Sequence, residues 1–132
     1  MHRTINTISC MQTPREVAES YWAAECRRDL DAALAHYHED ALLIPPSGPS
    51  LRGHRDIATF YVEEMRDYPG LEVTITHEIS DGVEAALEWE AVLIDHAGTR
   101  HPYRGVNVVR VRDGRFESVR AYFDPAAVEQ GA

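Results

Sequence analysis

The chain has 132 residues, 44% of them hydrophobic and 27% charged, which is the size and composition of one globular domain. Its 13 basic residues are all arginines and are outnumbered by 22 acidic residues, so the formal net charge of -9 disfavours nucleic acid as a partner. No apolar run approaches the roughly 20 residues of a membrane-spanning helix. Residues 1–11 contain no continuous apolar segment, and we therefore expect a cytoplasmic protein without a membrane partner.

The beginning of the chain carries a clear helix start. Residues 1–12 have no apolar period and are predicted to form an N-terminal tail. Thr13 is predicted to cap a helix, with Pro14 at its first position and Glu16 completing a capping box. Apolar side chains continue at helical spacing to Tyr37, which fits two short helices or one kinked helix equally well.

The middle of the chain changes from helical to strand spacing. Residues 41–44 predict a short strand that ends at two prolines, and residues 54–68 predict a third helix. Residues 71–79 and 83–94 alternate as strands. Residues 105–125 predict a closing hairpin, because two β-branched runs flank an Asp-Gly dipeptide. Helices laid across one face of such a sheet would enclose a pocket.

Two long stretches resemble a known superfamily. The segment RRDLDAALAHYHEDALLIPP followed by LRGHRDIATFY, and the ending DGRFESVRAYFDP, are similar to the nuclear transport factor 2 superfamily, and most of all to its SnoaL-like members. The resemblance implies an α+β, cone-shaped NTF2-like (cystatin-like) fold, in which a curved mixed or antiparallel sheet and three N-terminal helices enclose a pocket. It covers residues 13–128 as a single domain and leaves 129–132 as a C-terminal tail.

Ketosteroid isomerases, which are relatives of this group, provide a first comparison of site residues. The position of their catalytic Asp is occupied by Ile44, so their proton shuttle is missing here. Their oxyanion-hole Tyr resembles Tyr21, and their second oxyanion donor falls on Asn107. The resemblance therefore implies that Tyr21 and Asn107 together polarise a carbonyl group.

Limonene-type epoxide hydrolases provide a second comparison. Their Arg-x-Asp motif falls on Glu88, Trp89 and Glu90, and their second Asp falls on Ala121, so the arginine and one carboxylate of that mechanism are absent. SnoaL-like cyclases use a carboxylate in the pocket, and the resemblance implies Glu90 for that role. Strand alternation alone, in contrast, places Glu88 and Glu90 outside the pocket.

The function expected from these residues is that of a cofactor-independent cyclase or isomerase acting on a small, apolar, carbonyl-containing metabolite. The alternative is a ligand-binding or accessory protein of the same fold, and a third possibility is a purely structural dimerisation module. No histidine or cysteine spacing predicts a metal site. Tyr21, Glu90 and Asn107 are the predicted catalytic groups, and the predicted substrate-binding residues are Tyr61, Glu88, Trp89, Val119, Ala121 and Phe123.

The last hairpin also predicts an interface. Val109, Val111 and Phe116 share it with a second apolar set, so both faces of the hairpin carry apolar side chains. An exposed apolar patch usually contacts a partner. We therefore expect a homodimer formed across the outer face of the sheet.

Overall fold

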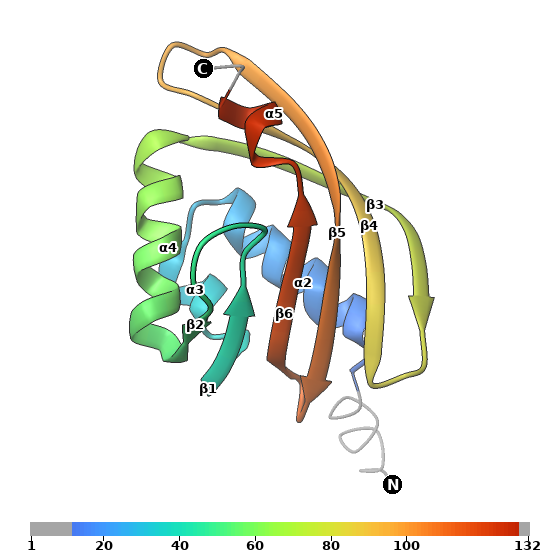
Figure 1. Ribbon diagram of the computed structural model, residues 1–132. Helices are drawn as coiled ribbons and strands as arrows, with labels where there is room; N and C mark the ends of the chain where they lie inside the picture. Colours follow the sequence, from blue (N-terminus) through green and yellow to red (C-terminus); the bar gives the residue numbers. More distant parts are fainter. Residues whose placement is uncertain (1–11, 130–132) are drawn as a thin grey trace, which may run out of the picture.

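A curved, unclosed sheet of six strands, in the order β2-β1-β6-β5-β4-β3, dominates the structure, a computed structural model that describes residues 12–129 (Figure 1). The α+β class, the curved sheet and the helices before it agree with the sequence prediction. In chain order the elements are α2 (Pro14–Cys26), α3 (Leu30–Leu34), β1 (Tyr37–Ile44), β2 (Leu51–Arg52), α4 (Gly53–Asp67), β3 (Gly70–Ser80), β4 (Glu84–Ile94), β5 (Arg100–Arg112), β6 (Arg115–Phe123) and α5 (Pro125–Glu129).

The first helix begins as the sequence predicts. The Thr13 side chain accepts a hydrogen bond from the backbone N–H of Glu16, and the Glu16 side chain accepts one from the backbone N–H of Thr13. The helix ends near Arg28, whose φ of 58° lies in the left-handed region. This break separates α2 from α3, so the stretch forms two helices and not one kinked helix.

Tyr37 lies in a strand, and the predicted helical stretch to this residue was therefore too long. Strand β1 begins at Tyr37 and runs parallel to β6, with Tyr37 opposite Phe116. Both side chains are almost completely buried, and their rings pack edge to face with centroids 5.2 Å apart. This long-range pairing overrides the local helical spacing of the preceding residues.

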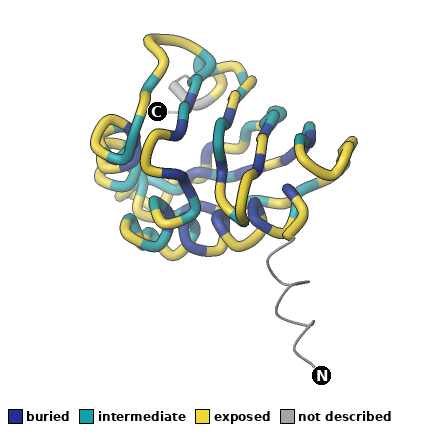
Figure 2. Tube along the Cα trace, turned by 90° about the horizontal axis from the view of Figure 1, so that it is seen from below, coloured by how far each residue is buried: buried dark blue, intermediate teal, exposed yellow. Residues whose placement is uncertain are grey.

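The helices cover the concave face of the sheet. Helix α2 packs against β3, β4 and β5, and α4 packs against β1. Figure 1 shows the long strands curving around α2, and Figure 2 shows the buried segments lying between the helices and the sheet. On β4 the buried positions alternate along the strand, and they are Ala85, Leu87, Trp89, Ala91 and Leu93.

The closing hairpin has the predicted turn. Asp113 and Gly114 both have positive φ, 55° and 75°, as the two central residues of a type I′ turn require. This turn joins β5 and β6 and brings Asn107 opposite Ala121. The turn therefore helps to fix which side chains of the two strands face the helices.

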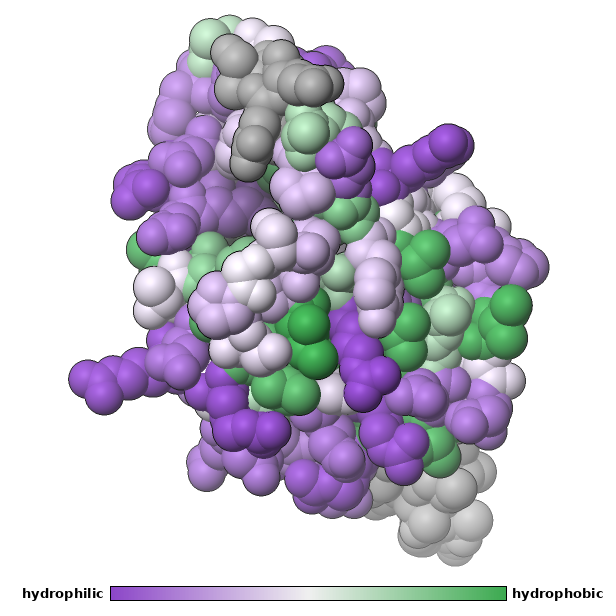
Figure 3. All heavy atoms as spheres, viewed as in Figure 1, coloured by the Kyte–Doolittle hydropathy of each residue, from purple (hydrophilic) through white to green (hydrophobic). Residues whose placement is uncertain are grey.

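The convex face of the sheet, which Figure 3 shows, carries apolar and charged side chains together. Val109, Val111 and Phe116 are buried in the core, while Val106, Val108 and Tyr122 lie on the opposite face of the same hairpin. Tyr122 is 56% exposed. Both faces of the hairpin are thus apolar, as the sequence suggests.

Two short elements, β2 and α5, were not predicted. Strand β2 pairs with the edge of β1, and α5 begins where the carboxylate of Asp124 accepts a hydrogen bond from the N–H of Ala126. The expected N-terminal tail lies outside the described residues except for Gln12, and the expected C-terminal tail except for Glu129. The domain limits at 13 and 128 stay predictions.

Candidate functional site

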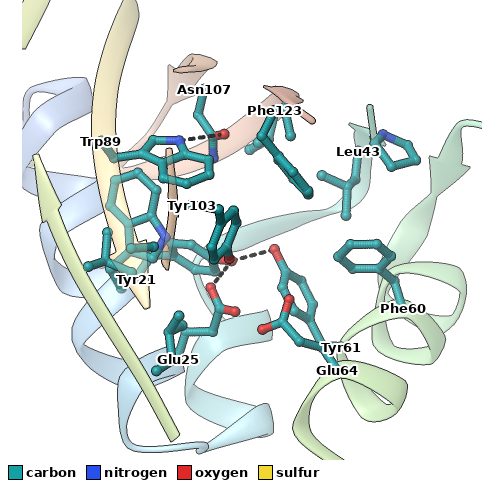
Figure 4. A pocket seen from close by; sticks show the side chains of 17 residues that line it. Tyr21, Glu25, Leu43, Phe60, Tyr61, Glu64, Trp89, Tyr103, Asn107 and Phe123 are labelled. Atoms are coloured by element: carbon teal, nitrogen blue, oxygen red, sulfur yellow. Dashed lines mark hydrogen bonds between the residues drawn. The ribbon is translucent and has the colours of Figure 1, made fainter. Parts of the chain in front are cut away.

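A cavity lies between helices α2 and α4 and the concave face of the sheet. Its volume is about 60 Å³, several times the minimum that one water molecule requires. Aromatic and aliphatic side chains form most of its wall, and four oxygen-bearing side chains gather at one end (Figure 4). The lining residues that carry the argument below are Tyr21, Glu25, Tyr61, Glu64, Trp89 and Asn107.

The polar end is built around a chain of buried hydroxyl groups. The Tyr21 hydroxyl donates to the carboxyl group of Glu25 across 2.5 Å, and it also contacts the Tyr61 hydroxyl. The hydroxyls of Tyr61 and Tyr37 lie 2.7 Å apart. Each hydroxyl has one proton, so with Tyr21 donating to Glu25, Tyr61 must donate to Tyr21 and Tyr37 to Tyr61. The hydrogen-bond chain therefore runs in one direction and ends at Glu25.

A second carboxyl group, that of Glu64, joins Glu25 from helix α4. Arg28 lies between the two: its Nη1 is 3.1 Å from Glu64 Oε1 and 3.7 Å from Glu25 Oε1. The Arg28 Nε–H also donates to the backbone carbonyl of Tyr68 across 3.0 Å. One guanidinium thus contacts two carboxyl groups, and its positive charge balances only one negative charge.

The shared environment raises the pKa of Glu25 well above its ordinary value of 4.5. Burial is the main cause, since Glu25 is only 4% exposed, and the charge of Glu64 and a hydrogen bond between the two side chains act in the same direction. The hydrogen bond from Tyr21 and the charge of Arg28 oppose the shift. The raised pKa favours the protonated form of Glu25, which can donate to the neighbouring carboxyl group of Glu64.

The tyrosines at this end are neutral. Burial is the main reason that the pKa values of Tyr21, Tyr37 and Tyr61 are raised above the ordinary value of 10. Burial likewise raises the pKa of Tyr103. The hydroxyl groups therefore act as hydrogen-bond donors and acceptors and not as charges.

The other end of the cavity is mainly aromatic. The rings of Trp89, Tyr103 and Phe123 pack edge to face, with centroids 5.2–5.8 Å apart. The Trp89 Nε1–H donates to Asn107 Oδ1 across 3.0 Å. Because the oxygen of the amide is engaged in this way, its NH₂ group is the donor that Asn107 can offer to a ligand.

Gly105 allows Trp89 to take this position. A Cβ atom added at Gly105 would lie 2.8 Å from Trp89 Cζ2 and 2.3 Å from the backbone oxygen of Tyr122. Both separations are shorter than any normal contact, so only glycine fits opposite this indole.

The structure brings most of the predicted site residues to the cavity. Tyr21 and Tyr61 lie at its polar end, and the members from the sheet are Trp89, Asn107, Val119, Ala121 and Phe123. Their roles as catalytic or substrate-binding groups stay predictions.

Glu88 and Glu90 are the exceptions, and their expected place in the pocket was wrong. Both are exposed on the convex face, because they alternate with the buried Leu87, Trp89 and Ala91 on β4. Glu90 instead borders a groove of about 660 Å³ on that face. Strand alternation predicted these positions correctly, and the alignment with cyclases did not.

The sequence analysis missed Glu25 and Glu64. A glutamate on a helix is exposed by default, and the superfamily comparison assigned no role to either residue. One signal was present: Glu25 follows Tyr21 by four residues and therefore lies on the same helix face.

Within residues 12–129, no group of three or more His, Cys, Asp or Glu side chains is placed to hold a metal ion. None of the helices there is long and apolar enough to cross a membrane.

Comparison with known proteins identifies relatives of this fold. A family model described as a SnoaL-like domain matches residues 18–128. An LEH-like epoxide hydrolase of Mycobacterium tuberculosis is 27% identical, with a TM-score of 0.74 over 88% of this chain and 86% of that protein. A comparison with curated proteins finds no match.

Two further solved structures share the fold at lower identity. A putative polyketide cyclase of Xanthomonas campestris is 23% identical, with a TM-score of 0.75 over 89% of this chain and 96% of that protein. A Mycobacterium tuberculosis protein solved in complex with estradiol-17β-hemisuccinate is 20% identical, with a TM-score of 0.75 over 88% and 98% of the respective chains.

Proposed function

Because the chain belongs to the SnoaL-like domain family, we propose that this small-molecule pocket protein moves a proton on a small, largely apolar carbonyl compound. The reaction would be that of an isomerase or a cyclase that needs no cofactor. The observation that carries the proposal is the pair of carboxyl groups, Glu25 and Glu64, which contact one guanidinium, that of Arg28, at the polar end of a largely aromatic cavity.

The two carboxyl groups divide the acid and base roles. Glu64, held by Arg28, takes the proton from the carbon next to the substrate carbonyl, and Glu25 returns a proton to a second carbon. One bond to hydrogen is broken and one is formed, so no oxidant or reductant is needed. The hydrogen bond between the carboxyl groups then allows the proton to pass back, and the site is reset.

Asn107 is the group that supports the carbonyl in this scheme. Its NH₂ group can donate to the oxygen on which negative charge develops, while Trp89 fixes the orientation of the amide. Tyr21 supports the same reaction from the other end, because its hydroxyl orients the carboxyl group of Glu25. The predicted pairing of Tyr21 with Asn107 on one carbonyl is thereby replaced by separate roles.

The experiment is proton exchange in deuterium oxide. Wild-type protein is incubated with a panel of small cyclic and unsaturated ketones, and loss of the α-proton signal is followed by NMR. Glu64→Gln should remove the exchange, since it removes the base and keeps the size. Glu90→Gln is the matched control, because the same change is made on the convex face. Equal exchange in wild type and Glu64→Gln would refute the proposal.

A second function, ligand binding without turnover, is favoured by one observation. The hydroxyl protons of Tyr21, Tyr61 and Tyr37 are all used within the hydrogen-bond chain, so none of these three can be donated to a substrate oxygen. Ketones that bind in a thermal-shift assay but exchange no proton would establish this alternative.

The homodimer is part of the proposal as well. On the convex face, Val106 lies between Glu88 on β4 and Tyr122 on β6, and Arg104 lies opposite Glu90. Such a face, with apolar positions and charges of both signs, can pack against a second copy of itself through a two-fold axis. A cytoplasmic location stays a prediction from the sequence.

A further inference from the structure

The deep end of the cavity presents hydrogen-bond acceptors. The hydroxyl protons of Tyr37, Tyr61 and Tyr21 all point along the chain toward Glu25, beside which Glu64 lies on the far side of the Arg28 guanidinium. A ligand that reaches this end therefore contacts oxygen lone pairs and a carboxylate. These three hydroxyls offer the ligand no proton, and a ligand group that carries positive charge matches them.

The walls beside the carboxyl groups also suit a cation. Seven of the lining side chains are aromatic rings drawn from helices and strands, and Phe60 and Tyr61 from α4 pack edge to face with centroids 5.3 Å apart. Ring faces attract an ammonium group, and the attraction is larger when the group is removed from water. The rings are Tyr21, Trp22, Phe60, Tyr61, Trp89 and Tyr103, with Phe123 at the far end.

The ionised side chains at this end of the cavity have an excess of one negative charge, which one more positive charge would balance. Glu25 and Glu64, if both ionised, carry two negative charges, and Arg28 supplies one positive charge. The raised pKa of Glu25 favours a proton on this group, which would neutralise the remaining negative charge. An organic cation of suitable size can neutralise this negative charge in place of the proton.

We infer that the cavity binds a ligand with an ammonium group, which is held by Glu25, Glu64 and the surrounding aromatic rings. This inference rests on the proposed function, because it concerns the same two carboxyl groups. An ammonium ligand that ionises Glu25 removes the acid of that reaction, so it competes with the carbonyl substrate for the cavity. Binding of a permanently charged ligand ionises Glu25, and one proton is released to the solvent.

The pH dependence of binding follows from this proton release. The proton competes with the ligand for Glu25, so affinity rises with pH until it passes the pKa of Glu25, by at most about tenfold per pH unit. The ionisable groups that face Glu25 are Tyr21, Arg28, Tyr37, Tyr61, Glu64 and Tyr103, with the Cys26 thiol next to it in the chain. Burial raises the pKa values of the tyrosines and of the thiol, so these groups stay neutral and do not contribute protons near pH 7.

The experiment compares two probes of the same shape. Choline carries a permanent positive charge, and 3,3-dimethylbutan-1-ol is its neutral carbon isostere. Isothermal titration at pH 6, 7 and 8 should show choline binding that strengthens with pH and is at least about tenfold tighter than binding of the isostere. Titrations in phosphate and in PIPES, two anionic buffers that differ in ionisation enthalpy, should show release of about one proton for each choline bound.

Glu25→Gln is the decisive variant. A glutamine can accept from Tyr21 and donate to Glu64, as the protonated carboxyl group does, but it cannot ionise. Choline binding should weaken by at least about tenfold and lose its proton release, while binding of the isostere should change little. Glu90→Gln should bind choline as wild type does.

Three results would overturn the inference: equal binding of choline and its isostere, choline binding without proton release, or unchanged choline binding in Glu25→Gln. If Glu25→Gln does not fold, the pH series and the two-buffer titration of the wild-type protein are sufficient to test the inference. The test is separate from the exchange experiment above. Ketone exchange without choline binding would refute only the cation site, and choline binding without ketone exchange would refute only the proposed reaction.

Discussion

Tyr21 and Glu25 lie one turn apart on helix α2, and the hydroxyl of the first donates to the carboxyl of the second across 2.5 Å in the buried interior. One face of this helix thus places both an aromatic ring and an ionisable group in the lining of the cavity. The hydroxyls of Tyr61 and Tyr37 extend the contact to α4 and β1. Substitutions in this set are expected to affect stability and site chemistry together.

Tyr21→Phe should destabilise the fold by about 1–3 kcal/mol, because Glu25 loses a donor while it stays buried. The hydrogen bond from Tyr21 lowers the pKa of Glu25, so its removal should raise that pKa further. Urea unfolding measures the first effect. Tyr122→Phe, on the convex face, is the control and should leave the free energy of unfolding nearly unchanged.

The raised pKa of Glu25 predicts a pH-dependent stability. In the unfolded chain the group titrates near 4.5 and in the folded chain at higher pH, so its contribution is complete below pH 4.5 and is lost as pH rises through the folded pKa. The free energy of unfolding should therefore fall with rising pH in this window, by at most about 1.4 kcal/mol per pH unit. Urea titrations of wild type between pH 5.5 and 8 provide the measurement.

Glu25→Gln isolates this effect from other groups. Hydrogen bonds and nearby charges lower the pKa values of Asp67, Glu72, Asp81 and Asp95, so the stability that these exposed carboxylates contribute is lost only as the pH falls below their ordinary values of 3.8–4.5, outside the measured range. Any contribution of other groups is the same in wild type and in the variant. The difference between wild type and variant cancels their contribution. A difference that stays constant across the pH range would contradict the assignment.

Gly105→Ala should be costly because a Cβ atom would collide with Trp89 and with the backbone of Tyr122. We expect a loss of about 1–3 kcal/mol in the free energy of unfolding and weaker binding of any ligand that contacts Asn107. Gly98→Ala is the control: its φ is +83°, but the new Cβ would meet nothing within 4 Å. Gly98→Ala should lower the free energy of unfolding by about 1–2 kcal/mol, because of backbone strain alone. Its ligand binding should not change.

Val106→Arg tests the proposed dimer. An added positive charge in the middle of the convex face should repel its own copy across the two-fold axis, and sedimentation velocity should show a monomer. Val62→Arg is the control, since Val62 is 47% exposed on helix α4. A monomeric wild-type protein, or a Val106→Arg variant that stays dimeric, would show that this face is not the interface.

Much of the fold was predictable because its signals are local. The capping box at Thr13 and the Asp113-Gly114 turn each depend on a few neighbouring residues, and both are present in the structure. Strand alternation was a reliable signal as well, because the pleat places successive side chains on opposite faces. Tyr37 was misassigned because its place depends on Phe116, a residue far away in the sequence.

The candidate site was predictable only in part, since its chemistry arises between elements. Nothing near Glu64 in the sequence indicates that helix α4 brings it beside Glu25 and Arg28. The Glu90 hypothesis depended on an alignment with cyclases, and the buried positions of β4 show that the alignment placed the carboxylate on the wrong face. Pairings across a cavity are set by packing, which a local pattern does not encode.

The parallel pairing of β1 with β6 has a consequence for how the chain acquires its structure. Strand β1 precedes the other long strands in the sequence, but its neighbour in the sheet is the last of them. During synthesis, the inner wall formed by Tyr37 and Leu43 stays unpaired until residues 115–123 have left the ribosome. We therefore expect the helices and the β3–β4 hairpin to form early, and the closing of β1 onto β6 to limit the rate of folding.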